Sequence, residues 1–417
     1  MPENAKKPQI RFKGFTDAWE QRKLNEINTF FTDGNYGEAY PKQSDLSDST
    51  NGIPFLTGGN LKNGILDLTG ASYITKEKHK KLMSGHLLED DIVIAVRGSL
   101  GALGYVTKKN VDWNINSQLA ILRTDKERLI GSFLIQYLLS ENAQNDFLSL
   151  MTGSALKQLP ISQLKNLVVP VTLIHEQELI AQLFNRVDNL ITLRQRKLDK
   201  LKNIKKSMLE KMFPKNGSNV PEIRFKGFTD AWEQRKLSNI AEKTFGGGTP
   251  TTSNNTFWSG TIPWIQSSDI TDGKLTGVIP KKYITQNGLN NSTAQLVPQN
   301  SIAVITRVGV GKLALMPFSY TTSQDFLSLS RLNTEPLFTA YSCYKKLQSE
   351  LNTVQGTSIK GITKDELLTK IIWIPKYNEQ VKISEILKNL DNLITLHQRK
   401  LEKLQNIKKA CLEKMFV

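Results

Sequence analysis

Residues 188–213 read DNLITLRQRKLDKLKNIKKSMLEKMF, and residues 391–416 read DNLITLHQRKLEKLQNIKKACLEKMF. The two copies differ at only five positions, which are Arg194/His397, Asp199/Glu402, Lys202/Gln405, Ser207/Ala410 and Met208/Cys411. A repeat this close, used once in mid-chain and once at the end of the sequence, indicates that the 417-residue protein consists of two related halves.

Each copy carries a heptad pattern, in which seam residues recur at alternating spacings of three and four. In the first copy these are Phe184, Val187, Ile191, Arg194, Leu198, Leu201, Lys205, Met208 and Met212. In the second they are Leu387, Leu390, Ile394, His397, Leu401, Leu404, Lys408, Cys411 and Met415. A pattern sustained for about four heptads predicts a coiled coil, whose polar seam residues fix register and partner. The alternative is an amphipathic helix that buries this face on a domain core.

The composition indicates a basic globular protein. Lys and Arg number 55 against 39 acidic residues, a net charge of +16, so the expected partner is a polyanion and above all nucleic acid. An incidentally basic protein is the alternative. The two cysteines, Cys343 and Cys411, form no CxxC motif, which excludes disulfide scaffolds and cysteine-based zinc clusters and favours a cytoplasmic location. Neither a signal peptide nor a membrane span is expected.

A second repeat is IRFKGFTDAWEQRKL, which occurs without change at residues 10–24 and 223–237. We call it the box and interpret it as a docking element that closes the fold, with direct nucleic-acid contact as the alternative. The predicted order is box, domain, helix, linker and second box, domain, helix. The corresponding boundaries are 1–24, 25–175, 176–213, 214–237, 238–378 and 379–417.

The two domains are diverged relatives and are expected to be mixed α/β. Matched motifs are IPFL/IPWI, SYIT/KYIT, VRGSLG/TRVGVG, NSQ/TSQ, GSALK/GTSIK and HEQE/NEQV. In the first domain, strand-like segments at 53–56, 92–97 and 119–123 alternate with helical patterns at 77–83 and 131–150.

The linker length predicts antiparallel helices. A helix over 176–213 would be about 57 Å long, whereas the linker 214–222 spans at most about 30 Å. The linker therefore cannot carry the chain back along the helix to make a parallel pair. An antiparallel pair would hold the domains at opposite ends and return the C-terminus to the region of residue 10, as a pseudo-twofold internal repeat.

Two basic domains separated by such a helix pair are suited to two short sites on one DNA duplex. Since one turn of DNA is about 34 Å, the two sites would lie about 10–15 base pairs apart. Because the domains differ within a common scaffold, the DNA target is expected to be asymmetric, with a spacer that is not read.

Candidate DNA contacts lie at matched positions and in the segments where the domains differ. Arg97 and Arg307 follow strand-like runs, and arginine pairs with guanine or phosphate. Gln118 and Gln324 could read adenine, and Lys157 and Lys360 could contact phosphates. Structural ion pairs or amides within the scaffold are the alternative for all six. Base-reading residues are expected where the domains differ, at 57–63 and 266–274, represented by Asn60 and Ser268.

No catalytic motif is found in the sequence. A self-contained methyltransferase would need a cofactor-binding glycine turn and an Asn/Asp-Pro-Pro-aromatic site, and neither is present. Residues 309–312, GVGK, are followed by Leu313 rather than Ser or Thr, so a glycine turn is expected instead of a phosphate loop. His79, His86, His175 and His397 show no metal-ligand spacing, and no metal or cofactor site is expected.

The whole chain resembles the specificity subunits of type I restriction–modification systems. The resemblance rests on GGGTPTTSNNTFWSGTIPWIQSSDI at 246–270, on IPFLTGGNL at 53–61, and on the ordered motif pairs and duplicated helix above. It implies two target-recognition domains that each read half of a bipartite site in double-stranded DNA. It also implies helices that dock two methyltransferase subunits, with endonuclease/translocase subunits joining for restriction. S-adenosylmethionine, ATP and Mg would belong to those partners, and this chain would be non-catalytic.

One departure from the family pattern is visible. The first domain has FFTDGNYGEAYPK at 30–42 in place of the GGTP stretch. Two other functions are weighed against DNA recognition: a two-headed scaffold whose partners are proteins, and an enzyme with its own methyltransferase or nuclease activity. A methylation assay on the purified chain separates the enzyme from the recognition subunit.

Overall fold

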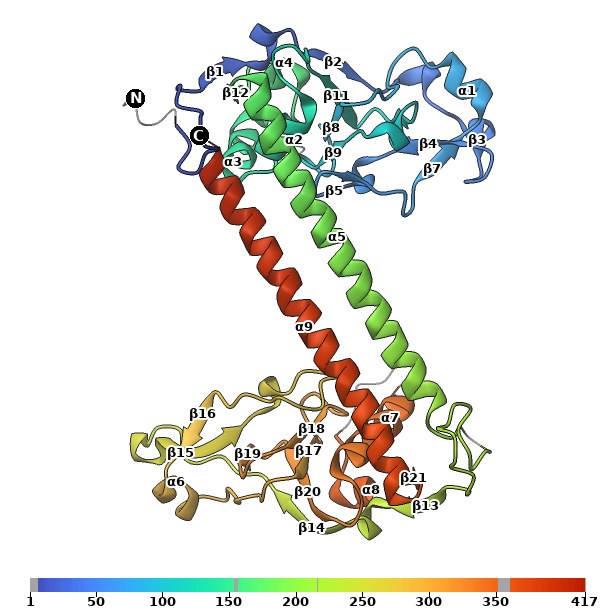
Figure 1. Cartoon of the computed structure of the whole chain (residues 1–417), viewed down its shortest axis with the longest axis vertical. Helices are drawn as coiled ribbons and strands as arrows, with labels where there is room; N and C mark the ends of the chain where they lie inside the picture. Colours follow the sequence, from blue (N-terminus) through green and yellow to red (C-terminus); the bar gives the residue numbers. More distant parts are fainter. Residues whose placement is uncertain (1–6, 154–156, 216, 352–360, 417) are drawn as a thin grey trace. The chain divides into compact units, whose positions relative to one another are not determined.

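The computed structural model describes residues 7–153, 157–215, 217–351 and 361–416. The chain divides into two compact units: unit 1 is residues 1–195 with 399–417, and unit 2 is residues 196–398. The elements of both are labelled in Figure 1. Each unit is mixed α/β, as predicted, and the helices α5 (Ile174–Lys211) and α9 (Tyr377–Met415) are each shared between the units.

The centre of unit 1 is a four-stranded antiparallel sheet in the order β2-β11-β8-β9. A second sheet has the order β10-β4-β7-β3, with β10 parallel to β4, and β5 pairs with β6 in a hairpin. The bounds are β2 (Phe30–Asp33), β3 (Leu46–Ser47), β4 (Ile53–Leu56), β5 (Leu61–Lys62), β6 (Ile65–Leu66), β7 (Ser72–Ile74), β8 (Ile92–Ala95), β9 (Leu103–Tyr105), β10 (Asn114–Ile115) and β11 (Leu119–Arg123).

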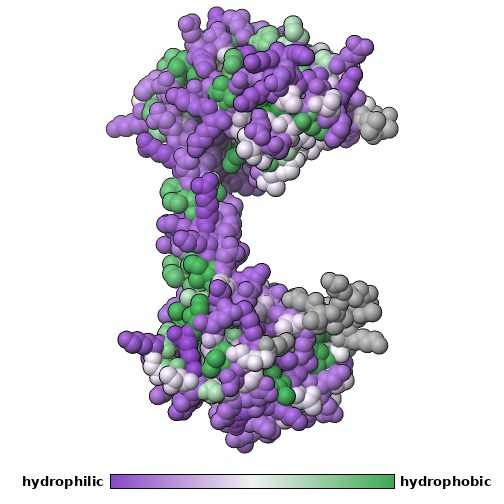
Figure 2. Space-filling model, turned by 90° about the vertical axis from the view of Figure 1, so that its right-hand side faces the viewer, coloured by the Kyte–Doolittle hydropathy of each residue, from purple (hydrophilic) through white to green (hydrophobic). Residues whose placement is uncertain are grey.

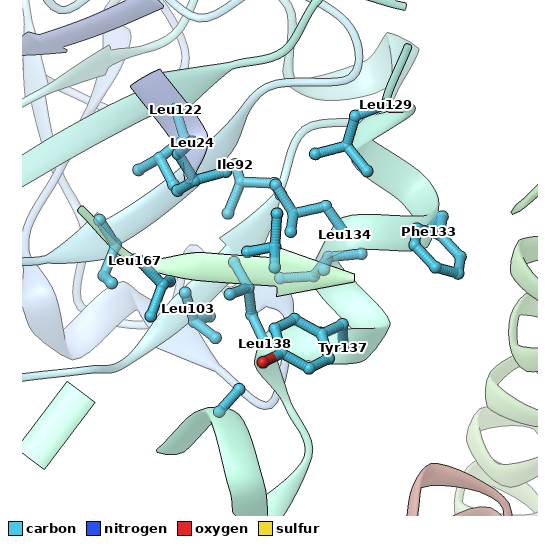
Figure 3. Close-up of a cluster of buried hydrophobic side chains, with 14 of the residues drawn as sticks. Leu24, Ile92, Leu103, Leu122, Leu129, Phe133, Leu134, Tyr137, Leu138 and Leu167 are labelled. Carbon is cyan, nitrogen blue, oxygen red and sulfur yellow. The ribbon is translucent and has the colours of Figure 1, made fainter. Parts of the chain in front are cut away.

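The central sheet of unit 1 is buried on both faces. Along β8, Ile92 and Ile94 contribute to one hydrophobic core, while Val93 and Ala95 contribute to another. Because side chains alternate across a strand, one apolar run can serve two cores. Figure 3 shows the first of these cores, where Ile92 and Leu122 from the sheet lie with Phe133, Leu134 and other residues of helix α2.

Two helices of unit 1, α1 and α3, begin at polar caps. The predicted helical pattern at 131–150 forms two helices rather than one, because the Ser140 hydroxyl accepts a hydrogen bond from the Ala143 backbone N–H and starts a new helix. Thr75 caps α1 in the same way. The helices are α1 (Lys76–Lys81), α2 (Gly131–Leu138), α3 (Glu141–Leu150) and α4 (Ile161–Leu164).

Unit 2 repeats this topology. Its central antiparallel sheet has the order β14-β20-β17-β18, and its second sheet has the order β16-β15-β19, with β15 parallel to β19. The strands are β14 (Ala241–Gly246), β15 (Trp258–Ile265), β16 (Lys282–Ile284), β17 (Ser301–Ile305), β18 (Leu313–Met316), β19 (Thr321–Thr322) and β20 (Phe326–Leu332). The helices are α6 (Gln286–Asn290), α7 (Pro336–Leu351) and α8 (Lys364–Thr369). The predicted common scaffold is therefore confirmed.

Each unit contains an antiparallel pair of helix segments. In unit 1, Phe184 near the start of α5 packs with Phe416 just beyond α9, and Lys408 Nζ lies 2.7 Å from Asp188 Oδ1. In unit 2 the equivalent pair is Lys205 and Asp391, 2.5 Å apart. As the residue number rises along α5, it falls along α9, so the antiparallel prediction is confirmed within each unit.

All eighteen predicted seam positions are buried or half-buried. The polar seam residues Lys205 and Lys408 are explained by these ion pairs, since each lysine contacts the aspartate that opens the DNLIT motif of the opposite helix. At these two positions the seam carries equivalent, specific charge pairs, which is how polar seam residues fix register.

Both boxes are docking elements, as predicted, and the structure shows that each docks on the first turn of a long helix. Arg11 contacts the Glu176 carboxylate through Nε at 2.6 Å and Nη2 at 2.9 Å, and the indole of Trp19 donates to the same carboxylate at 3.1 Å. In unit 2, Arg224 contacts Glu379 at 2.7 and 2.8 Å. The C-terminal part of each box is a strand: β1 (Glu20–Lys23) pairs with β12 (Val168–Val171), and β13 (Glu233–Lys236) pairs with β21 (Ile371–Ile374).

The boxes also receive the ends of the long helices. The backbone N–H of Ile10 donates to the Lys414 carbonyl at 2.9 Å. The backbone N–H of Ile223 donates to the Lys211 carbonyl, also at 2.9 Å. The end of the chain therefore returns to the region of residue 10, as expected.

The surface shown in Figure 2 is mainly hydrophilic, with small hydrophobic patches. Exposed leucines recur at equivalent positions of the DNLITL motifs, with Leu190 47% and Leu193 48% exposed in unit 1, and Leu393 43% and Leu396 46% in unit 2. Within the described residues, no helix has the length and apolar character needed to cross a bilayer.

Candidate nucleic-acid interface

Three loops meet at one end of the central sheet in unit 1. They are the turn 57–60 after β4, the glycine-rich turn 97–101 between β8 and β9, and the segment 116–118 before β11. The backbone N–H of Asn116 donates to the Leu56 carbonyl at 2.9 Å, which joins the third loop to the strand that leads into the first.

Further contacts bring these loops together. The backbone N–H of Arg97 donates to the Gln118 carbonyl at 3.2 Å. A Cβ atom added to Gly58 would lie 3.2 Å from the Cβ of Ser99, so the first two turns are almost in contact. The turn after the IPFL motif, the VRGSLG motif and the NSQ motif therefore lie together on one surface of unit 1.

Unit 2 assembles the same surface from its turn 266–269, its turn 307–311 and the segment 322–324. The backbone N–H of Ser323 donates to the Ile265 carbonyl at 2.9 Å, just as Asn116 does to Leu56 in unit 1. Each unit therefore presents an equivalent loop cluster built on an equivalent scaffold.

The loop that opens each domain reaches the same place despite its different sequence. A Cβ atom on Gly34 would lie 2.3 Å from the Asn116 carbonyl carbon, and one on Gly247 would lie 1.7 Å from the Ser323 carbonyl oxygen. Only glycine fits such a backbone approach. Gly34, in the divergent stretch 30–42, thus takes the role that Gly247 has in the GGGTP stretch.

The two candidate arginines are exposed at equivalent corners of this surface. The guanidinium of Arg97 lies 5.4 Å from the ring centroid of Tyr36 and donates weakly to Gln158 Oε1 at 3.4 Å. In unit 2, the side chain of Arg307 lies close to Gly361, whose added Cβ would be 3.7 Å from Arg307 Cγ. Arg97 is therefore oriented by an aromatic ring but keeps its charge near solvent.

The candidate glutamines are exposed on the same surface. Gln324 Oε1 accepts a hydrogen bond from the Thr249 hydroxyl at 2.6 Å, so this amide is oriented by the opening loop of its own domain. In Gln118 only the backbone carbonyl takes part in the hydrogen bond from Arg97 described above. Its side chain is exposed to solvent.

Asn60 holds its turn together rather than facing solvent. Its side chain is 2% exposed, its oxygen accepts from the Thr57 backbone N–H at 2.9 Å, and its amide donates to the Asp67 carbonyl at 2.8 Å. With both ends of the amide engaged, this residue supports the turn, in which Gly58 is buried and Gly59 is exposed.

The corresponding turn of unit 2 exposes side chains instead. Asp269 accepts from the Gln266 backbone N–H at 3.0 Å and so takes the supporting role of Asn60. Ser268 is exposed, and its hydroxyl accepts from the Gln266 side-chain amide at 3.0 Å. The two turns therefore share a backbone but differ in the chemistry that they present.

Lys157 is exposed and borders a surface hollow of unit 1, together with Lys62 and the turn Gly98–Ser99. Its matched residue, Lys360, lies outside the described residues. The placement of Lys157 beside backbone amides and a second lysine suits an anionic ligand such as a phosphate.

The glycines after β17 form a turn between strands, as predicted. Gly309 and Gly311 have φ angles of 90° and 88°, and the following strand β18 pairs with β17. No helix begins there among the described residues, so the geometry is not that of a phosphate loop.

Tyr36 and Thr249 are surface residues that the sequence did not single out. Tyr36 stacks on Arg97, and its hydroxyl donates to the Ser117 carbonyl at 3.0 Å. Neither residue belongs to a motif shared by both domains, since the opening loops have diverged, so no sequence signal pointed to them.

Comparison with known proteins agrees with this architecture. The sequence model described as "Type I restriction modification DNA specificity domain" matches twice, at residues 16–203 and 229–406. A candidate type I restriction enzyme MjaX specificity subunit from Methanocaldococcus jannaschii is 25% identical over 98% of this chain and 94% of its own length. The EcoR124I/EcoR124II specificity subunit of Escherichia coli is 32% identical, over 39% of this chain and 41% of its own.

A solved structure shows the same fold. The crystal structure of a type I restriction–modification S subunit from M. genitalium superposes with a TM-score of 0.67 at 13% identity and covers 99% of both chains. The two matches of the specificity-domain model together span most of the sequence and coincide with the two equivalent loop clusters. The chain therefore belongs to the family of type I restriction–modification specificity subunits, the non-catalytic DNA-recognition components of these systems.

Proposed function

We propose that each domain reads one half of an asymmetric, bipartite site in double-stranded DNA through its loop cluster. One observation carries this proposal: equivalent loops on an equivalent scaffold present different chemistry. The turn 57–60 presents glycine backbone where the turn 266–269 presents Gln266 and Ser268. Equal positioning with unequal side chains is what two different half-sites require, because base edges specify sequence whereas phosphate contacts position the protein.

The matched basic residues have the complementary role of phosphate contact. Arg97 and Arg307 are common to both domains and exposed, and Lys157 borders a hollow lined by a second lysine. Residues that do not change between domains of different specificity are suited to the sequence-independent part of binding. The net charge of +16 supports the same assignment.

The helix pair acts as the spacer and the docking site for two methyltransferase subunits. The exposed leucines of the two DNLITL motifs, Leu190 with Leu193 and Leu393 with Leu396, offer two identical apolar patches. Two identical patches suit two copies of one partner. Endonuclease/translocase subunits join this complex for restriction in the cytoplasm, and S-adenosylmethionine, ATP and Mg bind to the partner subunits.

The test is a methylome of cells that express this chain with a methyltransferase subunit. We expect one new methylated motif with two unlike halves and an unread spacer. In a variant whose segment 57–63 is replaced by residues 266–272, one half should change while the other half and the spacer stay the same. The wild-type chain is the matched control. A motif that changes in both halves, or no new motif at all, would contradict the proposal.

A further inference from the structure

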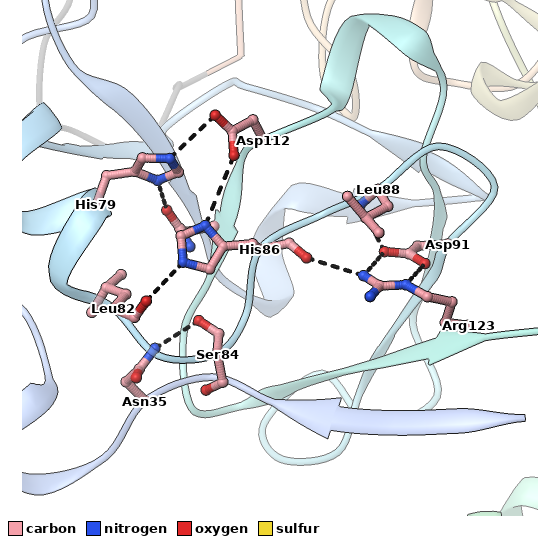
Figure 4. Close-up of polar contacts among 10 residues, drawn as sticks. Asn35, His79, Leu82, Ser84, His86, Leu88, Asp91, Asp112 and Arg123 are labelled. Atoms are coloured by element: carbon pink, nitrogen blue, oxygen red, sulfur yellow. Dashed lines mark hydrogen bonds and ion pairs between the residues drawn. The ribbon is translucent and has the colours of Figure 1, made fainter.

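Two histidines of unit 1 converge on one aspartate. His79 lies on α1 and His86 lies in the segment after it, with ring centroids 4.7 Å apart (Figure 4). His79 Nε2 lies 3.3 Å from Asp112 Oδ2, and His86 Nδ1 lies 3.9 Å from Asp112 Oδ1. One nitrogen of each ring and one carboxylate oxygen all fall within 4.8 Å of one another. The sequence spacing gave no sign of this grouping.

The remaining ring nitrogens fix which atoms point into the cluster. His86 Nε2 lies 2.9 Å from the Leu82 carbonyl oxygen, which only accepts hydrogen bonds, so this nitrogen carries the hydrogen. His79 Nδ1 contacts the side-chain oxygen of the buried Asn114. With the hydrogens on these outer nitrogens, His79 Nε2 and His86 Nδ1 face the Asp112 carboxylate as lone-pair donors to any cation bound there. Three electron-rich atoms facing one another are unfavourable unless a cation lies between them.

The distances and donor types fit a divalent metal ion. In a tetrahedral zinc site with bonds of about 2.0–2.1 Å, neighbouring ligand atoms lie about 3.3 Å apart. The His79–Asp112 distance already has this value. Asp112 has a side chain that is 69% exposed and so can adjust toward His86. Hydrogen bonds from the second ring nitrogens to a carbonyl or amide oxygen are the usual support of metal-binding histidines.

Unit 2 has the same scaffold without these residues. The matched motifs SYIT and KYIT place Leu289 where unit 1 has His79. The backbone N–H groups of Leu87 and Val297 donate to the Trp113 and Tyr320 carbonyls at 2.9 and 2.7 Å. By this correspondence, Leu296 of unit 2 occupies the position of His86, and Ser319 occupies the position of Asp112. The scaffold therefore does not need the histidine pair, which is a local feature of unit 1.

We propose that His79, His86 and Asp112 form a binding site for a borderline divalent transition-metal ion of the Zn²⁺ type, with water completing the coordination. Imidazole and carboxylate are ligands that such ions accept, and three protein ligands leave a position for solvent. The ion would join α1 to the segment that precedes β10. This inference does not depend on the proposed DNA recognition.

The location gives the metal a structural role near the candidate DNA surface. The side-chain amide of Asn35 donates to the Ser84 carbonyl at 2.8 Å, which ties the histidine-bearing segment to the opening loop. The neighbouring residue, Tyr36, stacks on Arg97. An ion at the histidines would therefore hold in place the segment against which this loop packs.

The test is Zn²⁺ titration of the full-length chain, freed of metal by a chelator and dialysed, followed by calorimetry. We expect saturable binding of one ion per chain and a rise in melting temperature of about 5 °C with Zn²⁺ at about 100-fold its Kd. The variant His79→Leu/His86→Leu, which copies unit 2, should lose both effects. The variant His175→Gln should keep both, because that ring is 73% exposed and remote from the cluster.

Asp112→Asn provides a second test that leaves the buried residues in place. We expect it to weaken Zn²⁺ binding at least about tenfold, since a neutral amide replaces the anionic ligand. Zn²⁺ binding of equal strength in Asp112→Asn and in the wild type would overturn the proposal. A melting temperature that responds to pH but not to Zn²⁺ would also overturn it, because a protonated histidine would then be the cation.

Discussion

At the scale of single residues, the most strongly buried ion pairs among the described residues belong to the docking of the boxes. The side chains of Arg11 and Glu176 are 11% and 0% exposed, and those of Arg224 and Glu379 are 13% and 1% exposed. A buried carboxylate that loses its partner is costly, because its charge is then uncompensated in a medium of low polarity. The unchanged sequence of the boxes is consistent with this shared contact.

Substituting Arg11 with Met should lower the free energy of unfolding by about 3 kcal/mol, measured by denaturant unfolding with tryptophan fluorescence. Arg22→Met is the matched control in the same box, since its pair with Glu20 is 51% and 63% exposed and should contribute less than about 1 kcal/mol. The double variant Arg11→Met/Glu176→Met should recover part of the loss. If Arg11→Met and Arg22→Met lowered the free energy of unfolding equally, burial of the Arg11–Glu176 pair would not explain its contribution to stability.

The exposed arginines of the loop clusters are expected to act on DNA affinity instead. Arg97→Gln and Arg307→Gln should each weaken binding about tenfold and reduce the slope of log K against log salt by about one. Fluorescence anisotropy over a series of KCl concentrations measures both quantities. Lys126→Gln is the control, because it also removes one positive charge but away from the loop cluster. Lys126 donates to the Glu89 carbonyl before the start of β8, whereas Arg97 follows the other end of that strand. An unchanged salt slope would contradict phosphate contact.

At the scale of elements, the two long helices combine apolar packing with two equivalent ion pairs. Lys205 and Asp391 are 12% and 13% exposed, whereas Lys408 and Asp188 are 16% and 32% exposed. The Asp391 carboxylate also accepts a hydrogen bond from the Tyr341 hydroxyl at 2.5 Å, which links the helix to its domain. Burial next to Asp391 raises the pKa of Tyr341 well above its ordinary range, so the phenol remains a donor.

A double-mutant cycle should rank the two pairs. We expect a coupling energy of about 1–2 kcal/mol for Lys205–Asp391 and a smaller one for Lys408–Asp188, because solvent screens the more exposed pair. Methionine at the lysine and asparagine at the aspartate are suitable replacements, and stability is measured by denaturant unfolding. Equal coupling, or the reverse order, would show that burial does not set the strength of these pairs.

The exposed leucines of the DNLITL motifs should determine assembly. Leu190→Ser/Leu193→Ser should reduce the number of bound methyltransferase subunits from two to one, and adding Leu393→Ser/Leu396→Ser should abolish binding, since each variant removes one apolar patch. Native mass spectrometry of the mixed subunits gives the stoichiometry. Met83→Ser is the control, as its side chain is 91% exposed but lies outside the motif. Retention of two subunits by the fourfold variant would exclude these patches.

At the scale of the whole molecule, near-identical and diverged parts alternate along the chain. The boxes and the helix ends are repeated almost unchanged, while the loop clusters differ. Repeated parts suit symmetric contacts with two copies of a partner, and diverged parts suit an asymmetric DNA target. We propose that this alternation separates assembly from recognition within one chain.

Lengthening both helices by one heptad in step should change only the spacer of the recognised site. The insertion adds about 10 Å to each helix, or about three base pairs at ~3.4 Å each, and leaves the loop clusters unaltered. Methylome sequencing of cells carrying this variant with a methyltransferase subunit measures the spacer directly. Insertion in one helix alone is the control and should disrupt the seam. An unchanged spacer in the variant lengthened in both helices would disprove the role of the helices as a ruler.

The sequence by itself determined the repeat, the mixed α/β class, the position of the long helices and the positions of the seam residues. These follow from local periodicity, because the spacing of apolar residues decides which face of an element is buried. It also indicated the family, because these ordered motif pairs resemble those of the specificity subunits. The helical pattern at 131–150 was divided into two helices by a single capping serine, Ser140. The periodicity of apolar residues does not show where such a cap ends one helix and begins the next.

Only the tertiary structure decided what each buried face meets. The partners of Lys205 and Glu176 and the convergence of His79 and His86 on Asp112 all join residues that are distant in sequence. Periodicity is a property of one segment, whereas these contacts depend on how two segments approach in space. The DNLITL helix, recognised first as a repeat, therefore gained its Asp–Lys partners only when the antiparallel fold brought its two copies together.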